Sequence, residues 1–294
     1  MLNNIKSINI LKTIFHNLER KIKLNILKYN KKIKRRLNIS NEDYKAFQTL
    51  KEFNAKFKLN IKHFEIEILD INRRNIGNEG LEYLSEIKFN GLETINLSWN
   101  QISNISSLQK MKLEKLNQLF LFSNEISDID VLENINLKEL KTLSLRCNYI
   151  RDISALEKAN LINLEELYLK SNEISNIKVF EKVKFKHLKV LSLEDNKISD
   201  INILEKVNFI ELEELYLNKN EISDISVLEK VKFDELKTLD LSTNKISIIN
   251  VLSQMKIEKL ENLYLYDNNI YIINGNDNFI IKNLRAKLKN FLYN

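Results

Sequence analysis

Proline is absent from this chain of 294 residues, and only four glycines occur in it. These two residues are the usual markers of turns and loops. The four glycines are too few and too dispersed for a phosphate-binding loop. The chain must therefore turn by other means, and a repeating backbone with asparagine at each corner is one of them.

Cysteine and long apolar runs are almost as scarce. A single cysteine, Cys147, excludes an internal disulfide framework and fits a reducing compartment. No apolar run approaches the roughly 18 residues that a membrane helix needs, and the first residues lack the pattern of a signal peptide. The sequence predicts a cytoplasmic protein, with the nucleus as an alternative, and no membrane insertion.

Residues for catalysis are also missing. The three histidines, His16, His63 and His187, are scattered, and Cys147 has no histidine at a fixed spacing. No group of cysteines and histidines has metal-ligand spacing. We therefore expect no catalytic residues, no bound metal and no cofactor, and we expect that the chain is not an enzyme.

What the sequence does contain is a 24-residue repeat, marked by eight asparagines. Around each of them recurs the frame L-x-x-L-x-L-x-x-N-x-I, in which the alternating leucines predict a short strand with one buried face. A buried asparagine amide can bond backbone groups at a turn, so we assign these residues to a structural ladder: Asn100, Asn124, Asn148, Asn172, Asn196, Asn220, Asn244 and Asn268.

This frame closely resembles that of the leucine-rich-repeat family. It covers residues 92–270, and a weaker ninth copy runs through Ile66, Leu69 and Ile71, with Arg74 where asparagine is expected. The resemblance implies an α/β solenoid with a parallel sheet on its concave side and short helices on its convex side. The I-S-D-I segments after the asparagine are similar to those of internalins and of phosphatase regulators. In the return half of one repeat, Ser223, Asp224 and Ser226 are candidates to cap a short helix.

A second, 48-residue period is superimposed on the first. At the central outward position of each strand, aromatic and small polar residues mostly alternate, which predicts rings separated by notches on the concave face. The column consists of Asn96, Phe120, Ser144, Tyr168, Ser192, Tyr216, Asp240 and Tyr264. The array therefore has the pattern of a duplicated two-repeat unit.

Outward aromatic and charged residues are the candidate contacts for a partner. Trp99, Phe120 and Phe122 are expected to lie close together near the N-terminal end of the array, and Tyr264 and Tyr266 share a face of its last strand. The charges on this face are mixed, which argues against a nucleic-acid track. The predicted partner-binding residues are Trp99, Phe120, Phe122, Arg146, Tyr168, Lys170, Tyr216, Tyr264 and Tyr266.

The N-terminal segment, residues 1–60, differs from the rest in charge, because it holds fifteen basic and four acidic residues. Apolar residues at helical spacing predict two or three amphipathic helices, one of them near Glu42–Phe53 with Ser40 as its N-cap. Residues 10–39 weakly resemble an F-box, an adaptor that joins leucine-rich repeats to ubiquitin ligases. A helical cap for the array is the alternative, and the basic run 31–36 is a candidate nuclear-localisation or nucleic-acid patch.

These observations divide the chain into a basic helical segment (1–60), an array of about nine repeats (61–272) and a C-terminal cap helix (273–294). The cap is expected over Phe279–Leu292, with Ile280, Leu284, Leu288 and Leu292 on one face. The predicted function is recognition of a protein or peptide on the concave face. The alternatives are a ubiquitin-ligase substrate receptor whose N-terminus binds a ligase adaptor, a regulatory subunit of a phosphatase, and nucleic-acid or acidic-surface binding through the N-terminus.

Overall fold

The protein forms one parallel sheet of ten short strands, and neighbouring strands of the sheet are consecutive in the sequence. The computed structural model describes residues 7, 26, 30–37, 40–271 and 275–293. The strands are β1 (Ile68–Asp70), β2 (Thr94–Asn96), β3 (Gln118–Phe120), β4 (Thr142–Ser144), β5 (Glu166–Tyr168), β6 (Val190–Ser192), β7 (Glu214–Tyr216), β8 (Thr238–Asp240), β9 (Asn262–Tyr264) and β10 (Asn290–Leu292). The predicted solenoid is confirmed.

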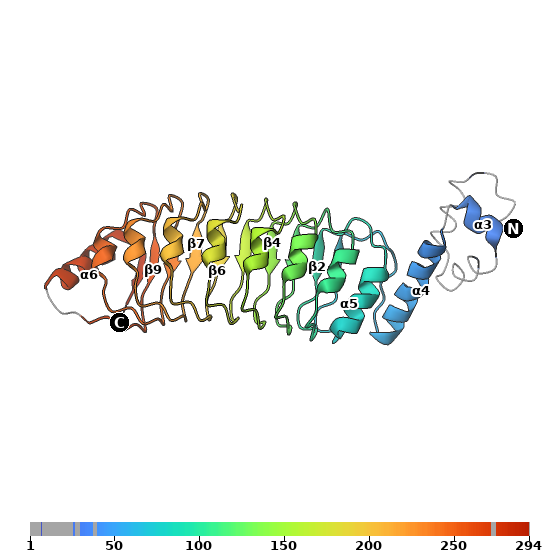
Figure 1. Cartoon of the computed structure of the whole chain (residues 1–294), viewed down its shortest axis with the longest axis horizontal. Coiled ribbons are helices and arrows are strands. Elements are labelled where there is room, and N and C mark those ends of the chain that lie inside the picture. The colour runs from blue at the N-terminus through green and yellow to red at the C-terminus, as the bar shows by residue number, and fades with distance from the viewer. Residues whose placement is uncertain (1–6, 8–25, 27–29, 38–39, 272–274, 294) are drawn as a thin grey trace.

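The return segments contain single turns of 3₁₀ helix. They are η2 (Ser106–Lys110), η3 (Asp130–Asn134), η4 (Ser154–Glu157), η5 (Lys178–Glu181), η6 (Asn202–Glu205), η7 (Ser226–Glu229) and η8 (Asn250–Ser253). In Figure 1 these turns follow one another in front of the strands. Of the three expected capping residues, Asp224 starts its turn, because its Oδ1 accepts a hydrogen bond from the backbone N of Ser226 at 2.8 Å. A turn this short suits 3₁₀ geometry, which is poor over longer runs.

The inward residues of all repeats form one continuous apolar core. In the repeat of β4, for example, Leu143, Leu145 and Ile150 are completely buried. Strands stay in register at 24-residue spacing, so that Leu143 lies beside Leu167. The outward side chains of the same strands are consequently left on an open face of the sheet, which the 3₁₀ turns do not cover.

Each of the eight repeat asparagines bonds at least three backbone groups. Nδ2 of Asn172 donates to the carbonyl oxygens of Leu145 and Leu169, both at 3.0 Å, and its Oδ1 accepts from the backbone N of Ile150 at 3.0 Å. Arg74 takes the asparagine position of the first repeat, where its backbone N donates to Oδ1 of Asn100. The side chains thus link each turn to its neighbour.

The N-terminal end of the array is covered by α4 (Asn41–Lys56), which packs against α5 (Gly77–Glu86), the helix of the first repeat. A short helix, α3 (Lys31–Arg36), precedes α4, and Figure 1 shows α4 beyond the first repeat. Ser40 caps α4 with a capping box to Asp43, as predicted. Phe53 of α4 is completely buried in the same core as the repeats. Most of the F-box-like segment, residues 10–39, lies outside the described residues.

The C-terminal cap differs from its prediction. A helix, α6 (Gly275–Lys287), begins earlier than expected, and the chain then forms β10, which pairs with β9. Leu292 is therefore in a strand and is 53% exposed instead of lying on a helix face. Leu292 continues the helical spacing of Ile280, Leu284 and Leu288 in the sequence, but it does not continue the helix. Backbone pairing with the free edge of β9 determines its conformation instead.

Candidate functional site

The outward side chains of the strands and of the turns after them form the open face of the sheet. The prediction of notches in this face is wrong, because the small residues expected to leave them are buried. Ser144 is only 5% exposed and Ser192 only 2%. Neighbouring strands lie about 4.8 Å apart, so larger side chains on both sides cover a small residue between them. The face is a closed surface of rings and charged groups.

Trp99 and Phe122 are in contact near the N-terminal end of this face. Their ring centroids are 5.4 Å apart in an edge-to-face arrangement, and the guanidinium of Arg73 lies 5.1 Å from the centre of the Trp99 ring. Trp99 is nevertheless 47% exposed. Phe120, half-buried, lies two residues before Phe122 on the same side of β3. The structure thus assembles the predicted cluster around one exposed tryptophan.

Trp99 owes its position to the turn after β2. Its φ is 58°, and the residue before the asparagine has a positive φ in every described repeat: Arg73, Trp99, Ser123, Cys147, Ser171, Asp195, Lys219, Thr243 and Asp267. This left-handed conformation is normally left to glycine. In these turns the left-handed conformation directs the side chain toward the edge of the open face at which the strands end.

A shallow cleft of 520 Å³ adjoins this edge. It is lined by residues that include Arg73, Trp99, Cys147 and Tyr149, and Tyr149 is 56% exposed. Arg73 and Tyr149 are not among the partner-binding residues predicted from the sequence. Both occupy positions next to the repeat asparagine or its equivalent, so their place in the 24-residue frame was the signal that would have found them.

Side chains in the middle of the face are held in place by contacts with other side chains of the same protein. The guanidinium of Arg146 lies 3.9 Å from the centre of the Tyr168 ring, and Lys170 forms an ion pair with Glu194. The Tyr168 hydroxyl donates to Oε2 of Glu166 at 3.3 Å. Burial, followed by the Glu166 charge, raises the pKa of Tyr168. These predicted contact residues are therefore preorganised.

Further along the face, Tyr216 stands among carboxylates. Its hydroxyl donates to Oε2 of Glu214 at 2.7 Å. Burial raises its pKa, and the Glu214 hydrogen bond and the charges of Asp240 and Glu194 add to this shift. Burial also raises the pKa of Asp240, against hydrogen bonds from Ser242. Negative charge is concentrated around this one ring.

Two aromatic residues lie on and just after β9, the strand beside the C-terminal edge strand β10. Tyr264 in β9 is half-buried, and Tyr266 just after it is 39% exposed. The predicted contact residues therefore follow the face from Trp99 after β2 to Tyr266 after β9, and they gather into separate groups.

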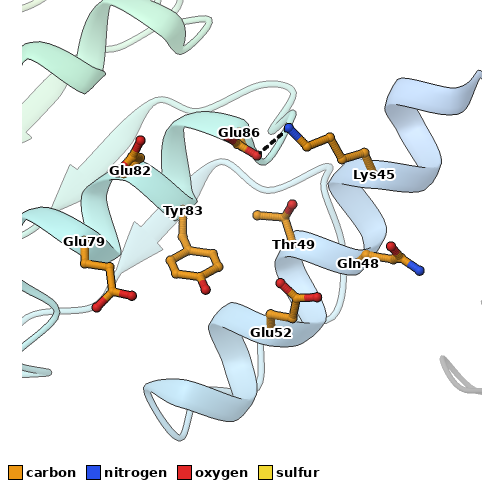
Figure 2. Close-up of a pocket in the computed structure, with 8 residues that line it drawn as sticks. All are labelled: Lys45, Gln48, Thr49, Glu52, Glu79, Glu82, Tyr83 and Glu86. Atoms are coloured by element: carbon orange, nitrogen blue, oxygen red, sulfur yellow. Dashed lines mark ion pairs between the residues drawn. The ribbon is translucent and has the colours of Figure 1, made fainter.

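A second cleft, away from this face, lies between α4 and α5 (Figure 2). It has a volume of 430 Å³, and four glutamates are among its lining residues. Figure 2 shows Lys45 and Glu86 reaching toward each other across the cleft, 2.9 Å apart. Lys56 pairs with Glu79 in the same region. These pairs connect the cap helix to the first repeat.

Catalytic and metal-binding groups do not converge within the described ranges. No three His, Cys, Asp or Glu side chains there are placed to hold a metal ion. His187 bonds Glu211 on the surface, with 3.0 Å between Nδ1 and Oε1, and Cys147 is exposed. His16 lies outside the described residues. None of the helices described is both long and apolar enough to cross a membrane.

Comparison with known proteins agrees with this architecture. The family model for leucine-rich repeats (two copies) matches residues 114–158, 162–206 and 210–254. No curated protein sequence matches the chain.

Solved structures share the fold. The internalin inlF of Listeria monocytogenes is 28% identical, with a TM-score of 0.63, over 82% of this chain and 69% of that one. Internalin C2 of the same organism is 29% identical, with a TM-score of 0.53, over 70% of this chain and 79% of that one.

A plant protein is similar as well. It is the ectodomain of the receptor kinase GASSHO1/SCHENGEN3 from Arabidopsis thaliana, solved in complex with CASPARIAN STRIP INTEGRITY FACTOR 2. The two chains are 25% identical with a TM-score of 0.54, over 71% of this chain and 24% of that one. The repeat frame, the asparagine ladder, the parallel sheet and these matches lead to one conclusion: the chain contains leucine-rich repeats and folds as a leucine-rich-repeat solenoid.

Proposed function

We propose that the chain binds a protein or an extended peptide on the open face of its sheet, and that it does so without catalysis. Trp99, packed against Phe122 and still half exposed, is the observation that carries this proposal. Tryptophan is enriched among the residues that dominate binding energy. The full set of proposed contacts is Trp99, Phe120, Phe122, Arg146, Tyr168, Lys170, Tyr216, Tyr264 and Tyr266.

The rigidity of the face supports this function. Every strand is bonded to its neighbours, and the side chains of Trp99, Tyr168 and Lys170 already have partners in the chain. A preformed surface loses little conformational entropy when it binds. The similar plant ectodomain was solved in complex with CASPARIAN STRIP INTEGRITY FACTOR 2, and binding on such a fold is in keeping with the proposal.

The first prediction tests this surface with a defined library. Dodecapeptides displayed on phage are selected on the full-length protein, and the affinity of a synthetic selected peptide is measured by fluorescence anisotropy. We expect Trp99→Ala and Phe122→Ala each to weaken binding about tenfold or more, since both remove a packed aromatic anchor. Ile248→Ala, which removes a 67% exposed apolar residue from another part of the repeat, is the control.

Circular dichroism establishes that each variant is folded. If no peptide is selected, or if the selected peptides bind all three variants as tightly as the unmodified protein, the open face is not the binding surface and the proposal is wrong.

A further inference from the structure

The 48-residue period places two tyrosines, Tyr168 and Tyr216, in equivalent positions with different neighbours. Beside Tyr168, Arg146 lays its guanidinium over the ring, 3.9 Å from the centre. One period later the position of Arg146 is taken by Glu194. No cation lies over the Tyr216 ring in the part of the chain that the structure describes. The first copy of the two-repeat unit thus has a guanidinium over its tyrosine ring, and the second copy lacks one.

The neighbours of Tyr216 are carboxylates, which favour a guanidinium at this position. Asp240 is its register partner in β8, Glu214 accepts its hydroxyl hydrogen bond, and Glu194 extends from the turn after β6. Of these three carboxylates, only Glu194 has a lysine partner, Lys170, among the described residues. The charges of all three add to the effect of burial in raising the pKa of Tyr216.

Two further polar atoms at this place have no partner. Ser192 is the register partner of Tyr216 in β6, is 2% exposed, and its Oγ makes no hydrogen bond. Oδ1 of Asn218, two residues beyond Tyr216 on the same side, is also buried and unbonded. A buried acceptor without a donor costs free energy. Asn218 Oδ1 therefore lacks a hydrogen-bond donor, and the Ser192 hydroxyl, which can donate or accept, lacks a partner of either kind.

We propose that Tyr216, Glu194, Glu214 and Asp240 receive an arginine side chain from the partner. A guanidinium is planar, stacks on aromatic rings and carries five N–H donors, so it suits a ring surrounded by acceptors better than a lysine ammonium does. The inference rests on the proposed function, because it names the chemistry of the peptide that the open face binds. The Arg146–Tyr168 pair is its template within the same chain.

The distance between the two parts of the face adds a requirement on the peptide. From β3, beside Trp99 and Phe122, to β7 there are four strand spacings, or about 19 Å. An extended peptide advances about 3.3 Å per residue. The arginine is therefore expected about six residues from the side chain that contacts Phe122.

The experiment compares forms of one selected peptide that carry arginine, lysine or neutral citrulline at the basic position. Their affinities for the full-length protein are measured by fluorescence anisotropy at physiological ionic strength. We expect citrulline to weaken binding about tenfold, since it removes a charge from a desolvated pair, and we expect lysine to fall between the two.

Two variants test the position of the site. Glu194→Arg places a guanidinium where Arg146 stands one period earlier, so it should fill the site and abolish the preference for arginine over citrulline. Glu214→Gln, a smaller change, should reduce that preference. Glu221→Gln removes the same charge from an exposed side chain that follows the repeat asparagine and pairs with Lys245, and it should leave the preference intact.

The outcomes separate the two proposals. If Trp99→Ala weakens the peptide but citrulline binds as well as arginine, or if Glu194→Arg keeps the full preference, the arginine site is wrong and the binding face remains. If selection yields no peptide, or none whose affinity depends on Trp99 or Phe122, both proposals are wrong.

Discussion

At the scale of single residues, the turn after each strand combines a strained conformation with an amide that holds it. Trp99 and Cys147 adopt φ values of 58° and 52°, which costs about 1–2 kcal/mol for a residue with a side chain. The next residue, asparagine, bonds backbone groups of two repeats. Removal of one amide should therefore affect the neighbouring turns as well as its own.

The second prediction concerns Asn172→Ala in the middle of the ladder. This change leaves the N–H of Ile150 without its bond, and it removes one of the two asparagine bonds to the carbonyl oxygens of Leu145 and Leu169, which keep those from Asn148 and Asn196. A buried group left unsatisfied costs about 1–3 kcal/mol and each further lost bond about 1 kcal/mol, so we expect the free energy of unfolding to fall by about 3 kcal/mol. Urea unfolding followed by circular dichroism measures it.

The adjacent change, Glu173→Ala, is the control, because Glu173 loses only surface ion pairs, with Arg151 and Lys197. Exposed ion pairs contribute about 0–1 kcal/mol each, so this variant should lose less stability than Asn172→Ala. An Asn172→Ala variant as stable as Glu173→Ala would show that the ladder does not hold the turns.

At the scale of elements, charged residues that precede neighbouring strands form a short row of ion pairs. Lys141 before β4, Glu165 before β5 and Lys189 before β6 meet with N–O distances of 2.8 Å on both sides of the glutamate. The hydrogen bonds from Lys141 and Lys189 lower the pKa of Glu165 to about 2. A carboxylate between two cations is a network, which isolated surface pairs are not.

The third prediction follows from this lowered pKa. The ionised form of Glu165 stabilises the folded state above its ordinary pKa of 4.5, and this contribution is lost as the pH falls toward about 2. The difference in free energy of unfolding between the unmodified protein and Glu165→Gln should therefore be largest above pH 4.5 and should vanish near pH 2. Urea unfolding over this range measures it.

Glu114→Gln, a change at an exposed glutamate with no ion pair in the ranges described, should give a difference that depends much less on pH. If the Glu165→Gln difference is the same at every pH, the lysines do not hold the carboxylate in its ionised form.

At the scale of the whole molecule, each repeat contacts its neighbours, so the two ends must be closed by other elements. The N-terminal end is covered by α4, whose Leu50 and Phe53 are buried in the common core. The C-terminal end is covered by α6 and by β10, which pairs with the edge of β9. The local stability of the repeats near each end is therefore expected to depend on the packing of the elements that cover that end.

The fourth prediction tests the N-terminal closure with Phe53→Ala. Phe53 is completely buried and packs against Phe57 and Tyr83, with ring centroids 5.0 and 6.4 Å away. Truncation of a buried phenylalanine costs about 3–5 kcal/mol. Hydrogen exchange measured by mass spectrometry should speed up in α4, α5 and β1 and change much less in β5–β9. The control, Lys51→Ala, removes an exposed side chain from the same helix.

Uniform acceleration along the array would show instead that the solenoid unfolds as a single unit. In that case the role of α4 would extend beyond closing one end.

The repeat frame determined the strands, their order and register, the asparagine corners and the face on which each side chain lies, because one backbone conformation recurs in each 24-residue repeat. Only the tertiary structure decided how side chains of adjacent strands meet. Trp99 on Phe122, Arg146 over Tyr168, the buried Ser192 and the strand at Leu292 depend on neighbours about one repeat away in sequence. Periodicity specifies where a side chain points, whereas packing against those neighbours determines what it touches.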